Sequence, residues 1–149
     1  CLMPSNLYGP GDSYHTENSH FFSALIKKIH TAKNTNQKSI TLWGTGKALR
    51  ELLLVDDLAE AVIYFMNKKF KDKFINIGSG VDHQITWYAK FIMKQLGIKL
   101  KIKYDKTKPD GMRRKLLDSS LAKKYGWKYK NSLQIGFKKT YKDFLKKHV

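Results

Sequence analysis

The chain has 149 residues, 42% of them hydrophobic, and a formal net charge of +17. This length and apolar content suit one globular domain and exclude an intrinsically disordered chain. No apolar run approaches the roughly 20 residues that a membrane-spanning helix needs, and no signal peptide is apparent. The single cysteine, Cys1, excludes a disulfide framework and a cysteine-based metal site. These features predict a cytoplasmic protein with no membrane partner.

The positive charge could indicate nucleic-acid binding, because clustered Lys and Arg neutralise phosphates. The chain contains only three arginines, Arg50, Arg113 and Arg114, and its lysines are spread over every segment. Surfaces that read bases depend on the bidentate guanidinium of arginine. The composition therefore favours a solvated, lysine-rich surface over a nucleic-acid face. Its positive field should still attract phosphorylated small molecules.

The first twelve residues have the pattern of a ligand-binding sheet edge. A short apolar stretch, residues 1–3, is followed by Asn6, Leu7 and Tyr8 and then by the turn 9–12. An apolar strand that ends in such residues is typical of the carboxyl edge of a parallel sheet, where ligands bind. Because no strand precedes this edge, we expect that part of the protein lies upstream of residue 1.

Apolar periodicity and capping residues predict the remaining elements. Strands are expected at residues 39–42, 51–55, 74–77 and 100–104. Helices are expected from residue 18 with Asn18 or Ser19 as N-cap, at 58–67 after the N-cap pair Asp56 and Asp57, after Thr86 as N-cap to Leu96 with Gly97 as the C′ residue, at 119–125, and from Ser132 onward. A long charged loop is expected at 105–115. The alternation of strands and helices predicts an α/β fold.

Several motifs, taken in order, resemble the GDP-L-fucose synthases. They are MPSNLYGPGD, NSH, LWGTGKALREL, VDDLAEAV, INIGSGVD and KPDGMRRKLLD. N-x-Y-G-P and V-D-D-x-A occur across the extended short-chain dehydrogenase/reductases, whereas the NSH, W-G-T-G-x-x-x-R-E and K-P-D-G-x-x-R-K segments are more particular to this family. The resemblance runs from about Leu2 to about Leu145, nearly the whole chain.

The resemblance implies the C-terminal part of a Rossmann-type extended reductase with its small α/β substrate-binding domain. Residues 1–16 would end an incomplete dinucleotide-binding domain. Residues 17–149 would mainly form the substrate-binding domain, with some segments returning to the Rossmann sheet. The implied cofactor is NADP, used as NADPH. The implied substrate is a GDP-sugar, GDP-4-keto-6-deoxymannose, which is epimerised and then reduced to GDP-L-fucose.

The family's Gly-rich loop, catalytic serine, epimerisation cysteine and Tyr-x-x-x-Lys pair lie upstream in such proteins. In this chain Tyr64 and Lys68 have the spacing of that pair, but their place in an amphipathic helix makes the match accidental. We therefore expect the chain to be inactive alone and to need the N-terminal half of the same protein as a partner. The family forms homodimers through helices of that half.

His20 is the candidate catalytic residue. It stands at the start of a predicted helix, and an imidazole that titrates near pH ~6.5 can transfer a proton at neutral pH. By the resemblance, His20 matches the general acid that protonates carbon during epimerisation, and it also contacts the cofactor. The alternative is a helix-start histidine that bonds to its own first turn.

Pro4, Ser5, Asn6 and Leu7 are the other candidate cofactor-binding residues. By the resemblance they lie along the nicotinamide cofactor, and backbone groups at a carboxyl sheet edge are free to bond a ligand. Without the resemblance they are simply a strand and its turn. We expect weak NADP binding by this chain alone, because the loop that holds the cofactor's phosphates is absent.

Trp43, Arg50 and Lys28 are candidate substrate-binding residues. A planar indole offers packing area to a sugar nucleotide, and a guanidinium binds diphosphate oxygens bidentately. Lys28 stands where the family has arginine, so it keeps the charge and loses the bidentate geometry. The alternatives are that Trp43 is a core residue and that Arg50 pairs with an acid such as Glu51.

Asp110 and Lys115 complete the predicted substrate site from the charged loop. Asp110 would accept hydrogen bonds from a nucleobase or a sugar, and Lys115 would contact phosphate. The alternative is a solvated connection. For Asp56 and Asp57, N-capping is favoured over metal binding.

Three other functions stay open. The chain could belong to another extended nucleotide-sugar epimerase or dehydratase. It could be a basic module that binds nucleic acid or acidic glycans, with a steep salt dependence. It could also be an inert truncation product whose open sheet edge promotes aggregation.

Overall fold

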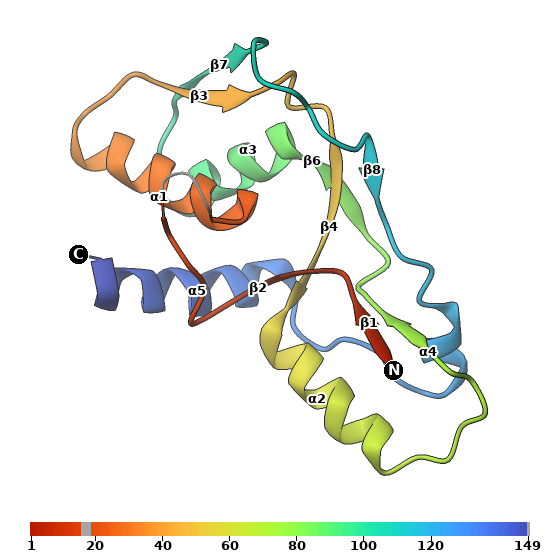
Figure 1. Cartoon of the computed structure of the whole chain (residues 1–149). Coiled ribbons are helices and arrows are strands. Elements are labelled where there is room, and N and C mark those ends of the chain that lie inside the picture. Colours follow the sequence, from red (N-terminus) through yellow and green to blue (C-terminus); the bar gives the residue numbers. More distant parts are fainter. Residues whose placement is uncertain (16–18, 149) are drawn as a thin grey trace. The chain divides into compact units, whose positions relative to one another are not determined.

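The structure is a computed structural model in which residues 1–15 and 19–148 are described. The chain divides into two compact units. The first unit comprises Cys1–Asp12, Glu51–Asp82 and Lys115–Val149, and the second unit comprises Ser13–Arg50 and His83–Arg114. Strands and helices alternate through the chain, and three strand pairs are parallel (Figure 1). The predicted α/β class is confirmed.

The first unit contains two parallel strand pairs. Strand β1 (Leu2–Pro4) pairs with β5 (Ile75–Ile77), and β2 (Asn6–Tyr8) pairs with β4 (Leu49–Leu54). Its helices are α2 (Val55–Met66), α4 (Ser120–Lys124) and α5 (Leu133–His148). One core cluster joins β4 and β5 to α2 and α4 and consists of Leu53, Ala61, Phe65, Ile75, Ile77, Ala122 and Trp127.

The second unit has helices α1 (Phe21–Asn34) and α3 (Ile85–Gln95) and the parallel strands β3 (Ser39–Trp43) and β7 (Lys101–Asp105). In Figure 1, β3 and β7 lie side by side, and α1 packs against α3 and β3. The predicted stripe on α1 is confirmed for most of its members, because Phe22, Leu25, Ile26 and Ile29 are buried.

Three short strands were not predicted from the sequence. They are β2, β6 (Asp82–Gln84) and β8 (Arg114–Lys115), and each of them belongs to the sheet that has β4 at its centre. A strand of two or three residues has too few positions for a period of two to show. Its existence depends on a hydrogen-bonding partner far away in the sequence. The predicted loop at 105–115 is therefore shorter than expected.

The predicted N-caps of α1, α2 and α3 are wrong where the structure describes them. The N-cap positions of α1, α2 and α3 are His20, Leu54 and Gln84, and none of the three makes a side-chain cap hydrogen bond. Thr86 lies inside the first turn of α3, where its hydroxyl donates to the Gly46 carbonyl at 3.0 Å. Asn18, the other predicted cap, lies outside the described residues.

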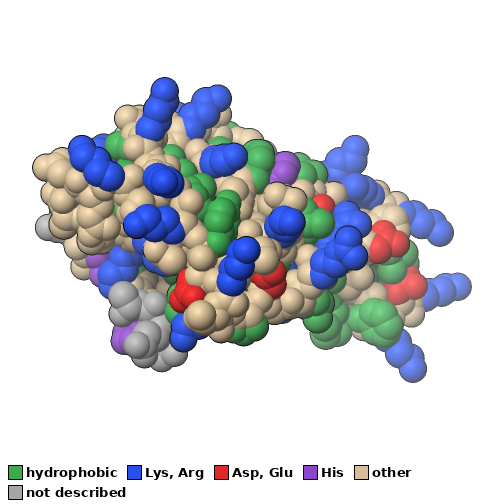
Figure 2. All heavy atoms as spheres, turned by 90° about the horizontal axis from the view of Figure 1, so that it is seen from above, with side chains coloured by type: hydrophobic (Ala, Val, Ile, Leu, Met, Phe, Trp, Pro, Cys, Tyr) green, Lys and Arg blue, Asp and Glu red, His purple; other side chains and the backbone are tan. Residues whose placement is uncertain are grey.

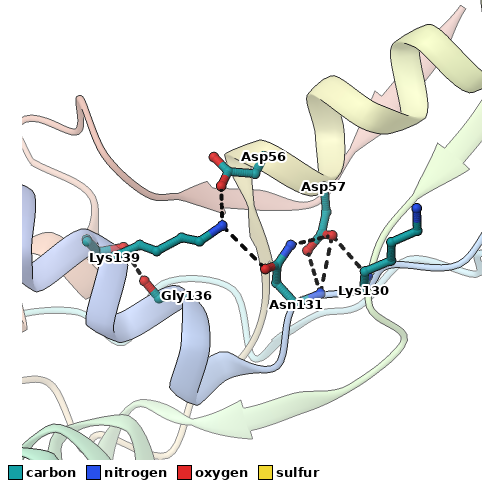
Figure 3. A network of polar contacts seen from close by, with 7 residues as sticks. Asp56, Asp57, Lys130, Asn131, Gly136 and Lys139 are labelled. Carbon is teal, nitrogen blue, oxygen red and sulfur yellow. Dashed lines mark hydrogen bonds and ion pairs between the residues drawn. The ribbon is translucent and has the colours of Figure 1, made fainter.

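Asp57 fixes a distant loop and does not cap its own helix (Figure 3). The side chain is 1% exposed, and its Oδ1 accepts hydrogen bonds from the backbone N–H of Lys130 and from Asn131 Nδ2, each at 2.9 Å. Asp56 makes a surface ion pair with Lys139, at 2.7 Å between Oδ2 and Nζ. Asp57 therefore joins the start of α2 to the segment that leads into α5, and Asp56 joins it to α5 itself.

Figure 2 shows Lys and Arg side chains scattered over the face in view and not gathered in one patch. Among residues 1–15 and 19–148, no helix is long and apolar enough to cross a membrane. Within the same described part of the chain, no group of three or more His, Cys, Asp or Glu residues is placed to hold a metal ion.

Candidate functional site

Trp43 projects from the last residue of β3 into solvent. Along this strand the alternation buries Ile40 and Leu42, and Trp43 is 57% exposed. The Lys108 ammonium lies 5.7 Å from the centre of the indole ring, at the distance of a cation–π contact. The reading of Trp43 as a core residue is therefore wrong. An exposed indole beside an ammonium offers a ligand a flat packing surface and, next to it, a positive charge.

The turn that follows Trp43 is tied to the charged loop through Asp110. Its Oδ1 accepts the backbone N–H of Thr45 and its Oδ2 accepts the Thr45 hydroxyl, both at 2.6 Å. Gly44 has φ +66°, and a Cβ at this position would collide with Asp110 Oδ1. Glycine is thus required here both by the backbone conformation and by the close approach of Asp110.

These hydrogen bonds change the part that Asp110 can play. The hydroxyl and then the backbone N–H of Thr45 are the main causes that lower the pKa of the Asp110 carboxyl, so this side chain is held as an anion. Since both of its oxygens already bond to Thr45, Asp110 shapes the loop. If Asp110 also accepts a hydrogen bond from substrate, as predicted, it must use the lone pairs that remain on its two carboxylate oxygens.

Arg50 is held by the same loop. Its Nη1 donates to the carbonyl of Met112 at 2.7 Å and to that of Leu49 at 2.8 Å. Nη2 lies 3.6 Å from the place that a Cβ of Gly111 would take, and it makes no hydrogen bond to any described residue. The alternative, in which Arg50 pairs with Glu51, is not found, because the Glu51 carboxylate accepts the N–H of Gly80. Arg50 therefore keeps donors available for a ligand.

Lys28 approaches β3 from α1. Its ammonium donates to the carbonyl of Thr41 at 2.6 Å, two residues before Trp43 in the strand. Partial desolvation of the ammonium lowers the pKa of Lys28 from its ordinary value. This contact with the backbone places the positive charge of Lys28 beside β3. A single ammonium makes it, so the bidentate geometry of an arginine is not required.

His20 occupies the N-cap position of α1. Its backbone carbonyl accepts the N–H of Ala24 at 3.0 Å, and its imidazole makes no cap hydrogen bond. The imidazole is exposed. The alternative that this histidine bonds its own first turn through the side chain is therefore not seen.

The predicted cofactor segment lies in the first unit, where most of its polar groups are already used. The Ser5 N–H donates to the Ile77 carbonyl at 3.0 Å, Asn6 Nδ2 donates to the Glu51 carbonyl at 2.8 Å, and Leu7 pairs with Leu53. The Ser5 hydroxyl is buried and has no partner among the described residues. Of these four residues, Ser5 is thus the one whose side chain is available to a ligand.

The structure brings some predicted residues together in the second unit, whereas others belong to the first unit. Trp43, Arg50 and Asp110 are joined through the 44–46 turn and the 110–112 segment of the second unit, which also holds Lys28 and His20. Lys115 is exposed in β8 and belongs to the first unit, as does Pro4.

Sequence reasoning missed two residues of this site, Thr45 and Lys108. Thr45 lies in the Gly44–Gly46 turn, where no local pattern indicates a partner for its hydroxyl. Lys108 is one of many lysines, and no local pattern separates it from the others. Only its contact with Trp43 in the folded chain distinguishes Lys108 from the other lysines.

The comparison with family models decides the classification. The model of the NAD dependent epimerase/dehydratase family matches residues 1–78, more than half of the chain. The chain belongs to the NAD dependent epimerase/dehydratase family. The match includes His20, Lys28, Trp43 and Arg50 as well as the predicted cofactor segment.

Individual members of this family are similar over nearly the whole chain. GDP-L-fucose synthase 1 of Arabidopsis thaliana is 44% identical over 144 residues, which are 97% of this chain and 45% of that protein. GDP-L-colitose synthase of Yersinia pseudotuberculosis is 45% identical over 144 residues, 96% of this chain and 47% of that protein. The predicted resemblance to the GDP-L-fucose synthases is confirmed.

A solved structure agrees with the fold. The GDP-D-glycero-L-gluco-heptose synthase of Campylobacter jejuni, determined in the presence of NADPH, is 28% identical with a TM-score of 0.84. The alignment covers 98% of this chain and 52% of that one. The predicted Rossmann-type fold of the extended reductases is thereby confirmed, and the chain spans about half the length of the relatives that it matches.

Proposed function

We propose that this chain is the substrate-binding part of an NADP-dependent enzyme that converts GDP-4-keto-6-deoxymannose to GDP-L-fucose. The observation that carries the proposal is the joined arrangement in the second unit. An exposed indole, Trp43, and a guanidinium with free donors, Arg50, are connected through one loop held by Asp110. A flat aromatic face and a bidentate cation are what a nucleoside diphosphate sugar requires.

The substrate would be held mainly by charge. Arg50 would donate to diphosphate oxygens through Nη2, which no described residue occupies. Lys28 and Lys115 would add positive charge, and Trp43 would pack against a ring of the ligand. The 44% identity to a GDP-L-fucose synthase favours guanine as the base.

His20 would act as the general acid of epimerisation. Its exposed imidazole is not used by the helix that it begins, so it remains available to a substrate carbon. A positioned acid or base of this kind contributes roughly 10²–10⁴-fold to rate. The upstream cysteine that the resemblance places opposite it would remove the first proton.

The cofactor segment fits NADP in one respect. The unpartnered Ser5 hydroxyl lies at the carboxyl end of β1, where dinucleotides bind in Rossmann-type sheets. The Campylobacter relative was solved with NADPH. The nicotinamide would supply hydride for the reduction. On this proposal Ser5 orients it, and the residues that hold its phosphates belong to a longer protein.

We expect this chain alone not to reduce the substrate. Tyr64 and Lys68 have the spacing of a reductase pair, but the Tyr64 hydroxyl donates to the Tyr125 carbonyl at 2.7 Å and Lys68 lies over the Tyr64 ring. Steady NADPH consumption by the isolated chain would contradict this expectation. A homodimer and the N-terminal half as partner remain part of the proposal for the longer protein.

Calorimetric titration with GDP and with UDP tests the proposal on the chain itself. We expect GDP to bind at least about tenfold more tightly than UDP, a difference of about 1.4 kcal/mol. Equal affinity for the two would refute the assignment of a GDP-sugar. Binding of neither nucleotide, with retention on DNA at low salt, would favour a basic nucleic-acid-binding module.

A second candidate is an enzyme that acts on another GDP-linked deoxy sugar. The 45% identity to a GDP-L-colitose synthase is as high as the 44% identity to GDP-L-fucose synthase 1 of Arabidopsis thaliana. GDP binding would be the same in both cases. Turnover of the two keto sugars by the longer protein distinguishes them.

A further inference from the structure

A hollow of about 510 Å³ lies in the first unit, where β5 runs into the turn of residues 78–81. Its wall also includes Ser119, Lys123, Trp127 and Lys128, and all of its lining residues belong to this unit. None of them is a predicted substrate or cofactor residue. The volume is many times the roughly 30 Å³ that one water molecule occupies. The hollow is therefore large enough for a small organic molecule.

Two residues in the wall of this hollow, Ser119 and Trp127, each carry a buried polar atom that has no partner among the described residues. Ser119 is 4% exposed and Trp127 is 3% exposed, and neither Ser119 Oγ nor Trp127 Nε1 has a hydrogen-bond partner among the described residues. Buried polar groups in native proteins nearly always have partners, so two orphaned groups on residues of one cavity wall need an explanation, and a bound molecule that reaches them supplies one. An indole N–H can only donate, so the missing group must accept.

Two cations line the same hollow. The Lys123 ammonium lies over the turn, 3.5 Å from the place that a Cβ of Gly80 would take. It makes no ion pair with any described carboxylate, and neither does Lys128. Ammonium groups, like the indole N–H, donate and do not accept. The wall thus offers donors and positive charge to an acceptor-rich group.

The acidic residues nearby are already engaged. Glu51 is fully buried beneath the turn, and its carboxylate accepts the N–H of Gly80 at 2.6 Å and that of Leu117 at 2.9 Å. Asp118 accepts the N–H of Ser120 at 2.9 Å and is exposed. Glu51 fixes the shape of the turn, and the N–H groups that donate to its carboxylate stabilise its negative charge.

We propose that this hollow binds the phosphate group of a small phosphorylated metabolite. Ser119 Oγ and Trp127 Nε1 donate to phosphate oxygens, and Lys123 and Lys128 balance the charge. The body of the metabolite fills the remaining volume against the Trp127 ring. This site is separate from the substrate residues of the second unit and does not depend on the function proposed for them.

The test uses the Trp127 indole N–H as a probe. The chain has three tryptophans, so a ¹H–¹⁵N spectrum contains three indole signals, and comparison with Trp127→Phe assigns one of them. On titration with inorganic phosphate at constant ionic strength, we expect the Trp127 signal to shift and saturate. Glucose 6-phosphate is the second probe; tighter binding than phosphate identifies an ester as the ligand, and equal binding identifies free phosphate.

Variants separate the proposed site from general charge attraction. We expect Lys123→Gln and Ser119→Ala each to weaken phosphate binding at least about fivefold. The matched control is Lys94→Gln, which removes one charge from the end of α3 in the second unit and should leave the affinity unchanged. Because the Ser119 hydroxyl has no partner, its removal should not impair folding, and this variant remains informative if Trp127→Phe does not fold.

The proposal fails if the Trp127 signal does not move with phosphate, or moves equally with chloride. It also fails if Lys94→Gln weakens binding as much as Lys123→Gln does. Either result would leave the two buried donors without a ligand.

Discussion

Asp110 and Thr45, separated by 65 positions in the sequence, are joined by two hydrogen bonds of 2.6 Å. The contact holds the turn after Trp43 against the segment whose Met112 carbonyl binds Arg50. The relative position of these two predicted substrate residues therefore depends on a residue pair that need not touch substrate at all.

We expect Asp110→Ala to weaken GDP binding by roughly tenfold, because the loop that positions Arg50 loses its attachment to the turn. The measurement is calorimetric titration with GDP. Asp105→Ala is a matched control, since Asp105 makes its own hydrogen bonds to Thr107 within the same loop. An equal loss in both variants would show that general loss of negative charge or of loop order, and not this contact, is responsible.

Acidification should release the same contact. The hydrogen bonds from the Thr45 hydroxyl and N–H lower the pKa of Asp110 below its unfolded value of about 3.9. The stabilisation is therefore fully present above the unfolded pKa and is lost as the pH falls through the folded pKa. In ¹H–¹⁵N spectra recorded from neutral to acid pH, we expect the Thr45 amide signal to titrate below the pH at which a free Asp does. Titration at or above that pH would contradict the assignment.

Arg50→Lys should weaken GDP binding by roughly tenfold although it keeps the charge. A lysine cannot bond the Met112 carbonyl and a diphosphate oxygen with the fixed fork of a guanidinium. Arg113→Lys is the matched control, because Arg113 is exposed in the neighbouring segment. If the two variants bind GDP alike, Arg50 does not act through its geometry.

His20→Gln tests the proposed general acid in the longer protein. We expect turnover of the keto sugar to fall by roughly 10²–10⁴-fold while the affinity for GDP stays within about twofold. His15→Gln serves as the control from the same region. A parallel loss of GDP affinity would assign His20 to substrate binding.

Asp57→Ala and Asp56→Ala should differ widely in stability. Asp57 is buried and bonds Lys130 and Asn131, so its loss leaves buried donors unpaired and should cost roughly 2–4 kcal/mol. The ion pair of Asp56 with Lys139 is about 40% exposed on both sides, and such pairs contribute about 0–1 kcal/mol. Urea denaturation of both variants measures the difference. Equal destabilisation of the two variants would contradict the conclusion that Asp57 fixes the loop at residues 130–131.

Much of the helical part of the fold could be predicted from local patterns. Most of the stripe that predicted α1 is buried, and the end of α3 just before Gly97 is the one expected from this glycine, which has φ +66°. These features depend on side-chain periodicity and on backbone preference, which act within a few residues. The start of α2 was placed three residues late, because Asp56 and Asp57 have the composition of an N-cap and lie inside the helix.

For the candidate site, the sequence by itself determined which residue types are present and, through its motifs, the family to which the chain belongs. It predicted Trp43, Arg50 and Asp110 as one site. Only the tertiary structure decided that Asp110 bonds Thr45, that Asp57 holds a distant loop, and that two residues with unpaired donors line one hollow. The physical reason is range: periodicity is a local property of the chain, whereas a hydrogen bond or an unpaired donor is defined by whatever residue the fold brings next to it.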